Sequence, residues 1–146
     1  MNILYMAHSG TRYLVLLAAV VAVVMLAMGF VRSRRGGEAQ SPGLAKGSRI
    51  GSVAFVGFLD LQVLLGIILV VVYVSEGLYY PALIGHIVMM FAAAVAAHVG
   101  SVLAKKRTGP GAYTAALFGV LAALALIVGG ILAIGRGVMQ SIPSPF

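Results

Sequence analysis

The chain has 146 residues, of which 62% are hydrophobic and 9% are charged, and its mean hydropathy is +1.10. A soluble domain of this size could not bury that much apolar surface, so the composition predicts an integral membrane protein and leaves no room for a soluble catalytic domain. Because cysteine is absent, disulfides, iron–sulfur clusters and thiolate metal sites are excluded.

Four long apolar runs account for nearly all of the chain. They predict an all-α bundle of four transmembrane helices forming a single domain, with spans at 11–31, 50–73, 82–104 and 113–135. A short amphipathic lead, MNILYMAHS, precedes the first span. That span is too long for a signal-peptide core and has no basic segment before it, so we expect a retained helix.

The basic residues are concentrated in two of the three predicted loops. The net charge of +7 alone would suit nucleic-acid binding, but the positions of the charges favour a membrane topology instead. Eight of the ten lysines and arginines lie in the first and third loops: Arg32, Arg34, Arg35, Lys46, Arg49, Lys105, Lys106 and Arg107. Only Arg12 and Arg136 lie on the other side. The positive-inside rule therefore predicts that both termini face outward.

Two histidines are expected at similar depth near the outer side. His8 lies just outside the first span, and His86 lies about 6 Å inside the outer end of the third. Two imidazoles facing each other between helices are the axial ligands of a six-coordinate haem b, so His8 and His86 are candidate metal ligands. In the alternative interpretation His8 is an interfacial residue and His86 is a packing histidine bonded to a carbonyl.

A second polar site is predicted nearer the cytoplasmic side. His98 and Asp60 lie in different apolar runs at comparable depth, and each would be unfavourable if left unpaired in hydrocarbon. Gln62 lies two residues after Asp60 and is counted with this site. The pair could orient a metal-ligating His98, form part of a proton or quinone site, or serve only as structure. A second haem here would need Met25 or Met28 as its other ligand.

Arg12 follows His8 by four residues, so the two share a helix face if the first helix begins early enough. Arg12 then either snorkels to the surface or pairs with a haem propionate or with Glu76. Tyr79 and Tyr80 are typical of an interfacial aromatic belt.

Small residues dominate the middle of the third span. Between His86 and His98 the chain reads Ala92, Ala93, Ala94, Val95, Ala96 and Ala97. Small side chains allow close approach of neighbouring helices, so we expect this segment to contact the rest of the bundle.

Three stretches resemble a family of small four-helix bacterial membrane proteins loosely described as cytochrome-b-like. They are HSGTRYLVLL at 8–17, DLQVLLG at 60–66 and GHIVMMFAAAVAAHVG at 85–100. The resemblance implies four helices, a respiratory or energy-coupling setting and a place in the bacterial inner (cytoplasmic) membrane. The layout is also similar to haem b membrane anchors, which usually carry two histidine pairs. This chain has three histidines, which provide one complete pair.

Two functions are consistent with these features. The first is an electron-transfer subunit with one haem b between His8 and His86, working beside a quinone-linked or cytochrome c-linked partner. The second is a cofactor-free accessory subunit packed against a larger respiratory or photosynthetic complex. In either case the chain is a membrane subunit rather than a stand-alone enzyme, and no nucleic-acid partner is expected.

Overall fold

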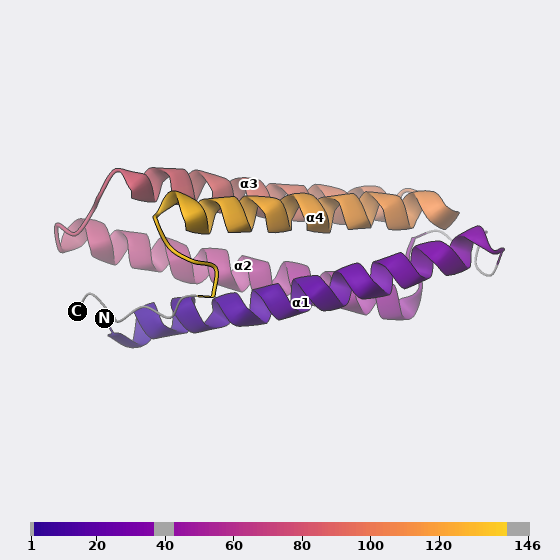
Figure 1. The fold of residues 1–146 in the computed structure, drawn as a ribbon, viewed down its shortest axis with the longest axis horizontal. Coiled ribbons are helices and arrows are strands. Elements are labelled where there is room, and N and C mark those ends of the chain that lie inside the picture. Colours follow the sequence, from indigo (N-terminus) through magenta and orange to yellow (C-terminus); the bar gives the residue numbers. More distant parts are fainter. Residues whose placement is uncertain (1, 37–42, 140–146) are drawn as a thin grey trace.

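The computed structural model describes residues 2–36 and 43–139, which form four α-helices and no strand. The helices are α1 (Asn2–Arg34), α2 (Lys46–Ser75), α3 (Ala82–Lys105) and α4 (Gly109–Ala133). All four are long and apolar enough to cross a membrane. The all-α architecture with four membrane-length helices is confirmed (Figure 1).

The helix bounds differ from the expected spans at several ends. The predicted lead before residue 11 is part of α1, which begins at Asn2, so His8 lies inside this helix rather than before it. No proline interrupts this stretch, and the exposed Gly10 is tolerated within the helix. Pro110 occupies the first turn of α4, where its missing N–H is not needed, so this helix begins before residue 113. α4 ends two residues early, just before Gly135 with its positive φ of 71°.

The four helices form a ring in chain order. α1 packs against α2 and α4, and α3 packs against α4 and α2. The pairing of α3 with α4 is the most extensive, whereas α2 and α3 pack together least. In Figure 1, α3 and α4 therefore form one layer above the crossing pair α1 and α2. The weak α2–α3 seam is where the bundle has room for a cavity.

Backbone contact joins α3 to α4. A Cβ atom built on Gly100 would lie 2.7 Å from the Cα atom of Gly119, and the reverse substitution would meet the same distance. Ala93 and Ala97 on α3 are buried, at 0% and 3% exposure. The packing role predicted for the 92–97 segment is confirmed at these two positions, because small side chains let the two backbones meet.

The two ends of the bundle differ in charge. We call the end where α1 and α3 finish and α2 and α4 begin the basic end, because its described residues include all eight cations of the first and third loops. The opposite end, where α1 begins, is called the N-terminal end. Hydrogen bonds close the basic end. The Ser48 hydroxyl donates to the Met25 carbonyl at 2.8 Å, and the Ala45 N–H donates to the Tyr113 hydroxyl at 3.1 Å.

Gly100→Ala is expected to lower the free energy of unfolding by about 1–3 kcal/mol, because the added methyl group meets backbone atoms that cannot turn aside. Gly57→Ala is the matched control, since a Cβ at Gly57 meets nothing within 4 Å. Unfolding of both variants in mixed micelles by titration with a denaturing detergent measures the difference. Equal stability of the two variants would contradict the close α3–α4 contact.

Candidate functional site

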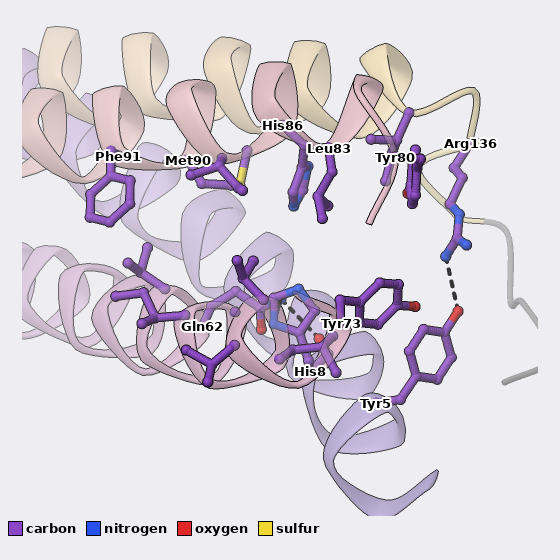
Figure 2. A pocket seen from close by; sticks show the side chains of 18 residues that line it. Tyr5, His8, Gln62, Tyr73, Tyr80, Leu83, His86, Met90, Phe91 and Arg136 are labelled. Carbon is purple, nitrogen blue, oxygen red and sulfur yellow. Dashed lines mark hydrogen bonds between the residues drawn. The ribbon is translucent and has the colours of Figure 1, made fainter. Parts of the chain in front are cut away.

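A cavity of about 320 Å³ lies between α2 and α3 toward the N-terminal end of the bundle. Its volume lies at the lower end of the range of ligand pockets, which is about 300–1,000 Å³. Most of its wall is aliphatic and aromatic, and Figure 2 shows His8 and His86 on opposite walls. The other polar or phenolic side chains in the wall are Gln62, Tyr5, Tyr73, Tyr80 and Arg136.

A second cavity of about 70 Å³ shares part of this wall. Both histidines line it, as do Gln62 and Arg136, and Arg12 joins them there. His8 and His86, predicted as partners from their depth, are therefore brought to one site by α1 and α3. The longer α1 is what makes this possible, because it carries His8 on a helix face that packs into the bundle.

His86 is held in a defined orientation. Its Nδ1 atom lies 2.9 Å from the carbonyl oxygen of Gly130 on α4. A carbonyl can only accept, so Nδ1 carries the proton and the neutral ring keeps its lone pair on Nε2. A Cβ atom on Gly130 would lie 3.6 Å from Nδ1, which is an ordinary van der Waals contact, and 2.6 Å from the Met90 methyl group, so this glycine mainly leaves space for Met90. Bonding of the far nitrogen to a carbonyl is the usual way in which a ligating histidine is oriented.

His8 is positioned by two residues of α2. A Cβ atom on Gly66 would lie 3.0 Å from Cε1 of His8, so this glycine leaves the space that the ring occupies. The Gln62 amide nitrogen lies 3.4 Å from both ring nitrogens, beyond the usual hydrogen-bond range of about 2.7–3.2 Å. The same nitrogen donates to the His8 carbonyl at 2.8 Å. The backbone that carries His8 is therefore fixed more firmly than its ring nitrogens.

Gln62 connects α2 to α1 in two ways. In addition to its bond to the His8 carbonyl, its side-chain oxygen accepts a hydrogen bond from the Thr11 hydroxyl. Gln62 is only 9% exposed. From the sequence, Gln62 was predicted to lie with Asp60 and His98; the structure corrects this, since Gln62 lines the cavity with His8 and His86.

Positive charge lies beside the two cavities. Arg136, just after α4, lines both of them, and its Nη1 donates to the Tyr5 hydroxyl at 2.9 Å. Arg12 lines the smaller cavity, donates from Nη2 to the Tyr13 hydroxyl at 2.9 Å, and lies 4.8 Å from the centre of that ring. Arg12 was among the site residues predicted from the sequence, whereas Arg136 and Tyr5 were not. Arg136 could have been predicted, because Arg12 and Arg136 are the only lysines or arginines in the sequence outside the two basic loops.

Asp60 and His98 are paired, as their shared depth predicted. Nε2 of His98 lies 2.9 Å from Oδ1 and 3.1 Å from Oδ2 of Asp60. Both side chains are about half exposed, and neither lines the cavity that holds the other two histidines. Met25 packs against the Gly47 and Gly51 region of α2, while Met28 is exposed. Nothing in the described contacts brings either sulfur to His98.

Within residues 2–36 and 43–139, no group of three or more histidine, aspartate or glutamate side chains could hold a metal ion. The two-histidine arrangement at the cavity remains the candidate metal site. Comparison with known proteins found no matching family, curated protein or solved structure. The resemblance to cytochrome-b-like proteins therefore stays a prediction.

The link between α1 and α2 is testable by a double-mutant cycle. Gln62→Leu should lower the free energy of unfolding by about 1–2 kcal/mol, because it removes both bonds to α1. Thr11→Val should lower the free energy of unfolding by a smaller amount. Because the two side chains share one hydrogen bond, the double variant should lose less stability than the sum of the two single losses. Strict additivity in detergent unfolding would contradict the contact.

Proposed function

We propose that this chain is a membrane electron-transfer subunit that binds one haem b between His8 and His86. The observation that carries the proposal is the presence of two imidazoles, from different helices, on opposite walls of one largely apolar cavity. The orientation of His86 strengthens it, because its Nε2 lone pair is left available for a ligand by the bond from Nδ1 to Gly130.

The residues around the cavity suit the rest of such a group. Leu83, Ile87, Met90 and Phe91 from α3, with Val63 and Val70 from α2, offer apolar contacts to a flat ring. Arg136 and Arg12 would neutralise two propionates, and the Tyr5 hydroxyl already accepts from Arg136. A haem held by His8 and His86 would supply one-electron transfer.

The chain's own residues would hold the geometry. The Gly130 carbonyl keeps His86 in one tautomer, and Gly66 keeps space for the His8 ring. Gln62 and Thr11 fix α1 against α2, so the distance between the two imidazoles depends on the helix packing. The apolar wall would limit access of water to a bound group, and this would strengthen the attraction between the arginines and the propionates.

The setting that we propose is the bacterial inner membrane, next to a larger quinone-linked or cytochrome c-linked complex. The eight cations at the basic end support an orientation with that end in the cytoplasm and the N-terminal end outside. The cavity then lies near the outer side, where a periplasmic redox partner could approach it.

A cofactor-free accessory subunit is the second candidate. One observation favours it, since the hydrogen bond between His86 and Gly130 also satisfies a histidine whose only task is helix packing. This alternative gives no reason for a second imidazole in the same cavity, nor for two arginines beside it. We therefore rank it below the haem proposal.

The deciding experiment is a reduced-minus-oxidised visible spectrum of protein purified from haem-sufficient cells. The parent is expected to give a low-spin b-type spectrum, and His86→Ala should abolish it because one axial ligand is lost. His98→Ala is the matched control, since His98 lies outside the cavity, and it should retain the spectrum. A parent protein without a Soret band, or equal loss in both variants, would leave the accessory-subunit alternative.

Orientation can be measured with single cysteines, because the chain has none of its own. Glu76→Cys, in the α2–α3 connection, should react with a membrane-impermeant maleimide in intact spheroplasts. Thr108→Cys, between α3 and α4, should react only after lysis. The opposite labelling pattern would place the cavity on the cytoplasmic side and remove the argument for a periplasmic partner.

A further inference from the structure

The larger cavity is open along one side of the bundle. Ile67 and Val71 of α2 and Phe91 of α3 line it, and these side chains are between 43% and 64% exposed. In a bilayer, exposed apolar side chains on helices of this length face the hydrocarbon. A molecule dissolved in the bilayer can therefore enter the cavity sideways, between α2 and α3, and its apolar part would stay among apolar groups.

The cavity follows the helices for about the depth of one lipid leaflet. Its wall on α2 extends from Gln62 to Tyr73, a rise of about 17 Å, and half of a bilayer core is about 15 Å thick. Figure 2 shows Phe91 at one end of the cavity and the hydrogen-bonded pair of Arg136 and Tyr5 at the other. The cavity thus suits an extended apolar chain with a polar group at the N-terminal end of the bundle.

That polar end is rich in hydrogen-bond donors. Arg136 lines both cavities, and among the described residues the Tyr5 hydroxyl is the only hydrogen-bond partner of its guanidinium. Tyr5 accepts this bond, so the proton of its own hydroxyl is free to be donated, and the residue is only 5% exposed. Arg12 adds a second positive charge to the wall of the smaller cavity.

The walls supply no negative charge. None of the described residues that line the two cavities is an aspartate or a glutamate. Of the three acidic residues in the sequence, Asp60 is paired with His98, Glu76 is exposed in the α2–α3 connection, and Glu38 lies outside the described residues. Arg136 is partly buried, and a partly buried cation is stabilised by an anion. The charge therefore favours an anionic head group.

We propose that the larger cavity binds a single-chain carboxylic acid of the fatty-acid class, taken up from the bilayer. Its carboxylate accepts hydrogen bonds from the Arg136 guanidinium and the Tyr5 hydroxyl, and its chain lies between α2 and α3. A phospholipid fits less well, because about 320 Å³ is small for two chains and the 70 Å³ beside Arg136 is small for a substituted phosphate. The proposal does not rest on haem binding, and the acid and haem would compete for the cavity.

The test observes the bound carboxyl group directly. Dodecanoic acid labelled with ¹³C at its carboxyl carbon is added to the protein in lipid nanodiscs, and its NMR spectrum is followed as the pH is lowered. We expect a resonance of bound acid that protonates at a lower pH than the acid in the surrounding lipid, because Arg136 stabilises the ionised form. Dodecanol has the same chain without the charge, so it should not displace the acid.

The titration is run on the parent and on His86→Ala, which carries no haem under the haem proposal and keeps Arg136 and Tyr5. A bound resonance in both proteins, or in His86→Ala alone where haem fills the parent, supports the acid site. Its absence from both proteins would overturn the site. The reduced-minus-oxidised spectrum decides separately whether haem binds.

Variants at the polar end identify the groups that hold the acid. Arg136→Gln, beyond the end of α4, should raise the Kd for dodecanoate at least about tenfold, because a hydrogen bond between charged groups is lost. Tyr5→Phe keeps the ring and should raise the Kd about two- to tenfold. Arg107→Gln removes one charge at the basic end and is the matched control, with parental affinity expected. Equal affinity in Arg136→Gln and Arg107→Gln, or displacement of the acid by dodecanol, would contradict the proposal.

Discussion

The close contact between Gly100 and Gly119 determines how the rest of the bundle is arranged. Because neither residue has a side chain, α3 and α4 meet backbone to backbone, and the alanines on either side extend the contact. α3 is thereby held to α4 rather than to α2. The seam between α2 and α3 stays loosely packed, and the larger cavity opens there with one histidine on each wall.

The need to satisfy polar groups in an apolar environment explains the three histidines. His86 bonds to a backbone carbonyl of its closest neighbour helix, and His98 bonds to a carboxylate on α2. The His8 ring has only long contacts to the Gln62 amide. The long contacts leave the ring nitrogens of His8 able to bind a ligand, as the proposed haem requires. This difference adds to the haem proposal, which rests on the two imidazoles that line one cavity.

The sequence predicted the level of each polar side chain along its helix, but the helix face on which the side chain lies was harder to predict. Asp60 and His98 were matched by depth alone, and the structure pairs them. Gln62 was assigned to the wrong side, although two residues correspond to about 200° around a helix and so place it opposite Asp60. Arg136 and Tyr5 could not be matched in advance, because they lie far apart in the chain and meet only where α4 ends beside the start of α1. The start of α1 at Asn2 was not predicted, because the polar residues at 8–12 lower the local hydropathy and placed the expected start of the span at residue 11.

α3 connects the two polar sites as a rigid element. His86 and His98 are 12 residues apart, which is about 18 Å along the helix and about 120° around it. One ring therefore lines the cavity, and the other lies half exposed on the outer surface of the bundle. The small residues between them hold α3 against α4, so neither ring can turn into the other's environment without breaking the Gly100–Gly119 contact. A cofactor held by His86 and the Asp60–His98 pair would thus lie at a fixed separation, set by the packing of a single helix.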